Sequence, residues 1–78
     1  MTNLEKYEKA FTETFGIERD QLNELKYQII PEWDSVGHMT LIATLEDALG
    51  ITMDTDDIID FSSFEKGKEI IKKYGIEL

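Results

Sequence analysis

The sequence predicts an all-α fold, a small antiparallel bundle of three main helices plus one short helix. Three segments of the 78-residue chain repeat apolar residues at helical spacing, and none alternates over a useful length as a strand would. Residues that start and stop helices lie at the ends of these segments. Residues 16–34 form a long connection, which we expect to be wrapped along the bundle.

The first helix is expected over residues 3–15. Thr2 and Glu5 have the spacing of a capping box, in which each side chain binds a free backbone N–H of the other, and Gly16 provides a stop. The apolar stripe of this helix consists of Leu4, Tyr7, Phe11 and Phe15. We expect this stripe to face the core.

The connection over residues 16–34 is expected to be pinned to the helices by apolar side chains. These anchors are Ile17, Leu22, Leu25, Tyr27, Ile29 and Ile30. A short helical turn over residues 19–25 is compatible with the sequence. Pro31 favours an extended residue before it and separates the connection from the next helix. Trp33 is expected to bury its ring against the start of that helix.

The second helix is expected over residues 35–49, with Asp34 as its N-cap and Gly50 as its stop. Its apolar residues fall on two sides. The side assigned to the core carries Leu41, Ile42, Leu45 and Leu49, and the other side carries Val36, Met39 and Ala43, flanked by Thr40, Glu46 and Asp47. A fully buried central helix is one interpretation. The two acids interrupt the second stripe and favour a partly apolar, acid-rimmed docking face.

A short third helix is expected over residues 56–61, followed by a longer fourth helix. The third would pack through Ile58, Ile59 and Phe61, and the apolar face of the fourth would carry Phe64, Ile70, Ile71 and Tyr74. Ser62 and Glu65 have the spacing of a capping box, and Gly75 would stop the fourth helix. Gly67 within that helix costs about 1 kcal/mol relative to alanine, which indicates close approach to another helix.

The composition indicates one domain over residues 1–78, and the absence of cysteine excludes a disulfide framework, a thiolate metal site and a thiol nucleophile. The net charge is −9, and residues 27–65 hold nine carboxylates but no Lys or Arg. This charge disfavours nucleic acid and anionic membranes and favours partners with basic patches. No apolar run approaches the length of a membrane span, so we expect a soluble, cytoplasmic monomer without membrane insertion.

Catalytic and metal sites are not predicted. His38 lies three residues after Ser35, a spacing compatible with a nucleophilic Ser/His pair. The Gly-x-Ser-x-Gly elbow of serine hydrolases is absent, however, because Trp33 occupies its first glycine position. His38 is therefore expected to be a packed, hydrogen-bonded residue. Asp54 and Glu65 have the outer spacing of an EF-hand loop, but isoleucines stand where a ligand and glycine are required.

The motif Asp34-Ser35-Val36, followed by an apolar helix, resembles the Asp-Ser-Leu motif of acyl carrier proteins, and the resemblance spans nearly the whole chain. In that family the serine carries 4′-phosphopantetheine, whose thiol holds an acyl or aminoacyl group as a thioester. The resemblance implies Ser35 as the attachment site and Asp34 as the motif acid. Val36 replaces the usual leucine. Trp33-Asp34-Ser35 is more similar to stand-alone carriers of specialised biosynthetic pathways than to housekeeping fatty-acid carriers.

The resemblance also implies partners. A separate phosphopantetheinyl transferase would attach the arm from coenzyme A. A loading ligase or synthase, acyltransferases and other pathway enzymes with basic patches would then dock on the second helix. The expected docking residues are Val36, Gly37, Met39, Thr40, Ala43, Glu46 and Asp47. The chain would not itself be an enzyme. Two alternatives stay open: a D-alanyl or other aminoacyl carrier, and an unmodified acidic module for protein interaction.

Overall fold

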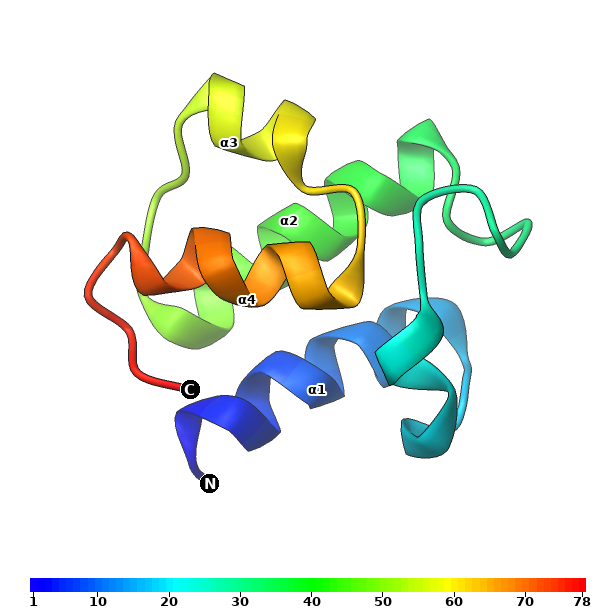
Figure 1. The fold of residues 1–78 in the computed structure, drawn as a ribbon, viewed down its shortest axis with the longest axis horizontal. Helices are drawn as coiled ribbons and strands as arrows, with labels where there is room; N and C mark the ends of the chain where they lie inside the picture. The colour runs from blue at the N-terminus through cyan, green and yellow to red at the C-terminus, as the bar shows by residue number, and fades with distance from the viewer.

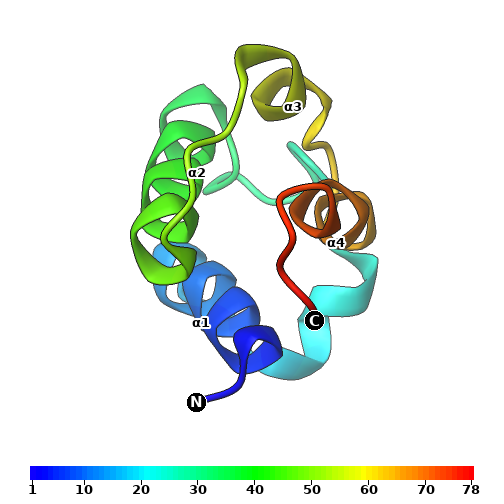
Figure 2. The same cartoon turned by 90° about the vertical axis from the view of Figure 1, so that its left-hand side faces the viewer.

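Three helices surround one core in the computed structural model, which describes residues 1–78: α1 (Asn3–Phe15), α2 (Ser35–Leu49) and α4 (Phe64–Lys72). A 3-10 helix, η1 (Arg19–Glu24), lies in the connection, and the short α3 (Thr55–Asp60) precedes α4. Seen from one end, α1 and α2 lie side by side and α4 faces them (Figures 1 and 2). The predicted all-α bundle is confirmed. No helix is both long and apolar enough to span a bilayer.

The bounds predicted for α1 and α2 are confirmed, and local capping explains both. The Thr2 hydroxyl accepts from Glu5 N (3.1 Å), and the Glu5 carboxylate accepts from Thr2 N (2.9 Å). Gly16 and Gly50 close the two helices with φ angles of 65° and 66°, in the left-handed region that glycine adopts without steric cost. The two helices pack against each other through their predicted core faces.

The connection is pinned to α4 by backbone as well as by side chains. Leu22 and Leu25 are buried. On either side of Lys26, Tyr27 N donates to Ser62 O (2.8 Å) and Phe64 N donates to Leu25 O (2.9 Å). The prediction of apolar anchors is wrong for Ile29, which is 59% exposed, because the turn that contains it projects away from the core.

Helix α4 begins one residue later than the predicted capping box requires. The Ser63 hydroxyl, not that of Ser62, accepts from Lys66 N (2.9 Å), so the Ser62–Glu65 box is wrong. The antiparallel bridge between Lys26 and Ser63 holds Ser63 in an extended conformation. The helix therefore starts only at Phe64. The predicted close approach of another helix at Gly67 is confirmed, because a Cβ atom there would collide with the Tyr7 hydroxyl of α1.

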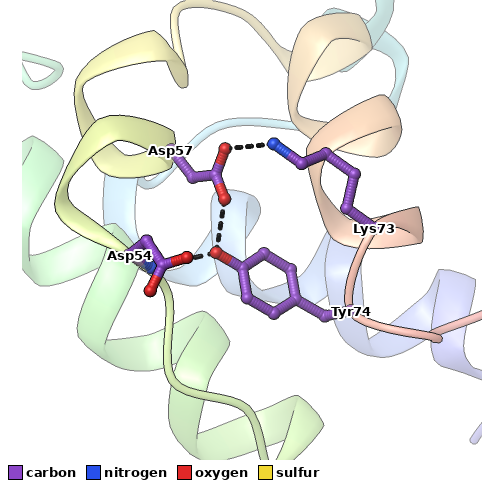
Figure 3. A network of polar contacts seen from close by, with 4 residues as sticks. All are labelled: Asp54, Asp57, Lys73 and Tyr74. Atoms are coloured by element: carbon purple, nitrogen blue, oxygen red, sulfur yellow. Dashed lines mark hydrogen bonds and ion pairs between the residues drawn. The ribbon is translucent and has the colours of Figure 1, made fainter.

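Helix α3 differs from the prediction in its bounds and in its buried face. It runs over Thr55–Asp60 rather than 56–61, and Ile59, predicted to pack inward, is 72% exposed. Asp57 is the buried residue of this helix, at 6% exposure. Its carboxylate accepts from Lys73 Nζ and from the Tyr74 hydroxyl, each at 2.5 Å (Figure 3). Polar contacts with the end of α4 therefore decide which face of α3 turns inward.

Replacing Asp57 with asparagine is expected to destabilise the protein in a pH-dependent way. The hydrogen bonds from Lys73 and then Tyr74 hold the pKa of Asp57 below its ordinary value of 3.8. A carboxylate with a lowered folded pKa stabilises the fold above its unfolded pKa, and this contribution is lost as pH falls through the folded pKa. We expect Asp57→Asn to lower the Tm by about 5 °C at neutral pH and by much less near pH 2.

Thermal unfolding followed by circular dichroism at both pH values would measure this difference. Asp56→Asn is the matched control, since Asp56 lies on the same helix, is exposed and forms no ion pair. An equal loss of Tm for Asp57→Asn at the two pH values would contradict the role given to its ionised carboxylate.

Candidate functional site

Ser35 is exposed and is the first residue of α2. Asp34 precedes it in an extended conformation, and its Oδ1 accepts from Gly37 N (2.8 Å), which confirms the predicted N-cap. The Asp34 carbonyl oxygen accepts from His38 N (2.8 Å). The Ser35 hydroxyl is thus presented at the positive end of a helix that Asp34 caps at Gly37 N.

An apolar cavity of about 320 Å³ lies beside Ser35, between the start of α2 and α3. It is lined by Tyr27, Ser35, His38, Met39, Ile58, Ile59, Phe61 and Ser62. The lining comes from the connection, α2, α3 and the segment after α3. The contributions of Tyr27, Ile58 and Ile59 were not predicted as parts of a site. For Ile58 and Ile59 the signal in the sequence is an apolar residue placed next to an acid, whereas Tyr27 has no such signal.

His38 joins the connection, α2 and α3 through both of its ring nitrogens. Trp33 Nε1–H donates to His38 Nδ1 (2.9 Å), which places the ring proton on Nε2. Nε2 then donates to the Ile58 carbonyl oxygen (2.8 Å). The prediction of a packed, hydrogen-bonded histidine is confirmed. Because both nitrogens have these partners, His38 does not pair with the Ser35 hydroxyl.

Trp33 connects His38 to the aromatic core. Its side chain is fully buried, as predicted, and stacks on Phe15 with ring centroids 5.2 Å apart. Its indole N–H points at His38, so these two rings lie edge to edge and nearly in one plane, with centroids 6.1 Å apart and an interplanar angle of 16°. The aromatic core of α1 therefore continues through Trp33 to the histidine that lines the cavity.

The predicted docking residues divide into an exposed group and two residues with structural roles. The exposed group on α2 consists of Val36, Met39, Thr40, Ala43 and Asp47. Val36 and Met39 are 74% and 55% exposed, and a shallow depression along this side is lined by α2 alone. Ile59 of α3 adds a further exposed apolar side chain next to Met39 at the cavity.

Gly37 and Glu46 also have structural roles. A Cβ atom at Gly37 would collide with the Glu32 carbonyl oxygen and lie 3.3 Å from the Phe15 ring, so this position requires close backbone approach. The Glu46 carboxylate accepts from Met53 N (2.9 Å) and thereby orders the chain after α2. In the sequence, the signal for the role of Gly37 is a glycine within a helix, and the signal for the role of Glu46 is an acid near a helix end.

The surroundings of Ser35 are strongly acidic. Of the nine carboxylates in residues 27–65, only Asp57 and Glu65 form ion pairs, and their partners Lys73 and Lys68 come from outside that range. No group of three or more His, Asp or Glu side chains is placed to hold a metal ion. The exposed apolar residues of α2 and α3 thus belong to a segment of the chain in which most carboxylates form no ion pair.

The structure therefore brings together a capped, exposed hydroxyl, an apolar cavity and an acid-rimmed apolar helix face. Such a site can present a covalently attached group and can attract a basic protein surface. Comparisons of the chain with models of protein families, with curated proteins and with solved structures found no match.

Proposed function

We propose that this chain is a carrier protein that receives a phosphopantetheine arm on Ser35 and carries acyl groups as thioesters for partner enzymes. The observation that carries the proposal is the exposed Ser35 hydroxyl at the capped start of α2, directly beside the apolar cavity. The arm, when attached, would supply the thiol that this cysteine-free chain lacks. The resemblance of Asp34-Ser35-Val36 to the carrier motif supports the same chemistry.

The residues around Ser35 fit such a group. A phosphodiester on its oxygen would lie at the N-terminus of α2, where the helix dipole and free N–H groups favour negative charge. Asp34 keeps the first turn in place through its bond to Gly37 N. The cavity beside Ser35 offers about 320 Å³ of largely apolar space to the cargo end of the arm.

Partner enzymes would dock on the exposed group of α2 and on Ile59. The apolar side chains would lose their contact with water, and surrounding acids such as Asp47 would pair with basic residues of the partner. Electrostatic attraction of this kind speeds association and weakens with salt. Catalysis would belong to those enzymes, and the chain would contribute a raised local concentration of the tethered reactant.

Modification of Ser35 is tested by incubating the protein with a promiscuous phosphopantetheinyl transferase, coenzyme A and Mg²⁺. In this reaction the Ser35 oxygen bonds to the phosphopantetheinyl phosphorus, the adenosine bisphosphate part of coenzyme A leaves, and the transferase takes the hydroxyl proton. Intact-mass spectrometry is expected to show the gain of one phosphopantetheine unit, with peptide mapping to Ser35.

Two variants make the result specific. Ser35→Ala is expected to gain no mass, whereas Ser62→Ala is expected to gain the full unit, although Ser62 is also exposed and lines the same cavity. If the folded wild-type protein gains no mass with a transferase that modifies other carriers, the carrier proposal is wrong. The acidic face of α2 would then favour an unmodified interaction module.

A further inference from the structure

A second hollow, which we call the loop groove, lies on the connection between α1 and α2. It has a volume of about 340 Å³. Its lining residues are Ile17, Asp20, Gln21, Glu24, Leu25, Ile29 and Ile30. None of them lines the cavity beside Ser35. The loop groove is therefore a separate surface of the molecule.

The loop groove has an apolar base. Leu25 is 3% exposed and belongs to the core, and Ile17 and Ile30 are half-buried against that core. Ile29 is 59% exposed and is not packed against the core cluster. An aliphatic side chain of another molecule placed here would remove the exposed surface of Ile29 from water and gain contact with Leu25.

Two unpaired carboxylates stand at the edge of this apolar base. Asp20 and Glu24, both exposed on η1, take part in no ion pair and no side-chain hydrogen bond of the structure. The neighbouring Arg19 directs its guanidinium away, to Glu8 of α1 at 3.1 Å. No Lys or Arg lines the loop groove. The chain therefore supplies negative charge here without supplying its counter-charge.

Both sides of the loop groove are ordered by hydrogen bonds. On one side, Glu18 N donates to Gln21 Oε1 (2.8 Å) at the start of η1. On the other, Ile29 N donates to Lys26 O (3.0 Å) and Trp33 N donates to Ile30 O (3.1 Å). A ligand would meet a surface that is already formed, so little ordering would be required on binding.

The turn beneath Ile29 also contains an unusual backbone conformation. Gln28 has a φ of 66°, in the left-handed region that non-glycine residues rarely adopt, and its N–H donates to Trp33 O (3.0 Å). The surrounding bonds hold this conformation, and it directs the following residue, Ile29, into solvent. Exposure of Ile29 is thus built into the fold rather than caused by a mobile loop.

We propose that the loop groove binds a short segment of a partner protein that combines an aliphatic side chain with Lys or Arg. The aliphatic side chain packs on Leu25 and Ile29, and the cation pairs with Asp20 and Glu24. Charge selects this occupant, because a second copy of this chain, with a net charge of −9, or an anionic membrane would be repelled. The binding uses no residue of the Ser35 site and requires no modification of the chain.

The test is a titration of the ¹⁵N-labelled full chain with an acetylated, amidated peptide of alternating leucine and arginine, followed by amide chemical shifts. The largest shifts are expected over residues 17–30, with saturation and a Kd of about 1 mM or tighter. A peptide with glutamate in place of arginine is expected to leave these amides unshifted. Modification of Ser35 is not needed, so this result is independent of the carrier test.

Matched variants separate local pairing from general attraction to an acidic protein. Asp20→Asn combined with Glu24→Gln is expected to weaken binding about tenfold, from the loss of two ion pairs. Asp56→Asn combined with Glu77→Gln, at exposed carboxylates that form no ion pair and lie outside the loop groove and the docking face of α2, changes the net charge equally and is expected to change the Kd less than about twofold. The proposal would be overturned if both double variants weakened peptide binding equally, or if the largest amide shifts lay in α2.

A second pair of variants tests the apolar contact. Ile29→Ser is expected to weaken peptide binding about fivefold through lost burial of one aliphatic side chain. Ile29→Leu, which keeps an aliphatic side chain at the same position, is expected to leave the Kd unchanged. The position is exposed, so neither variant endangers the fold. If Ile29→Ser has no effect on the Kd, the loop groove is not the binding surface.

Discussion

Replacing Gly67 with alanine is expected to destabilise the protein by about 3 kcal/mol, a large part of the total stability of so small a domain. A Cβ atom at this position would lie 2.6 Å from Phe61 Cε1 and closer still to the Tyr7 hydroxyl. That hydroxyl donates to the Phe64 carbonyl oxygen (2.6 Å) inside the core, so it has no free direction in which to move. The helix-propensity gain of about 1 kcal/mol from Gly to Ala does not offset this collision.

Urea unfolding, followed by circular dichroism, measures the effect. Gly75→Ala is the control for backbone strain alone, because its φ is 80° but a Cβ atom would meet nothing within 4 Å. We expect that control to lose about 1 kcal/mol. Stability of Gly67→Ala at or above the wild-type value would show that α4 can move away from α1 without cost, contrary to the packing described.

Replacing His38 with leucine is expected to cost about 2–4 kcal/mol, because two polar groups lose their partner at once. The Trp33 indole N–H lies in a fully buried side chain, and the Ile58 carbonyl oxygen belongs to α3. Leucine fills similar space but offers neither acceptor nor donor. We also expect faster amide hydrogen exchange in α3, because it loses its hydrogen bond to α2.

A double-mutant cycle isolates the contact between the two rings. Trp33→Phe removes the indole N–H, so His38→Leu should cost less in that background than in the wild-type protein. The remaining cost would report the lost bond to Ile58. If the two substitutions are strictly additive in urea unfolding, the Trp33–His38 hydrogen bond contributes nothing to stability.

The ends of α1 and α2 could be predicted because their signals lie within a few residues of one another. Thr2 with Glu5, and Asp34 with the N–H of Gly37, form contacts that span three residues of sequence. Gly16 closes its helix in the same local way. Apolar spacing then indicates which side of each helix is buried. These are local interactions, and sequence spacing alone specifies them.

The orientation of α3 could not be predicted, since it depends on residues distant in sequence. Asp57 is buried because Lys73 and Tyr74, 16 and 17 residues further on, pair with its carboxylate. The nearby sequence alone favours burial of the isoleucines of α3 over burial of an acid. The prediction that Ile59 packs inward is wrong for this reason. The choice between Ser62 and Ser63 as helix cap likewise depends on pairing with the distant Tyr27 backbone.

The candidate site shows the same division. Ser35 and its cap follow from adjacent residues, so they could be located from the sequence. The cavity requires the connection, α2 and α3 to be placed in space, and no spacing rule joins Tyr27 to Ile58. The loop groove requires the path of the connection itself, which no helical spacing specifies. The bond from Met53 N to the Glu46 carboxylate could not be predicted either, because Met53 lies beyond the end of α2.

The hydrogen bond between Trp33 and His38 gives the chain an intrinsic fluorescent probe. Trp33 is the single tryptophan, and the imidazole against it also lines the cavity beside Ser35. The fluorescence of this indole therefore comes from one known position, one side chain away from the cavity. Entry of an apolar group there would perturb the imidazole and change the emission, so occupation of the cavity can be followed in real time on unlabelled protein.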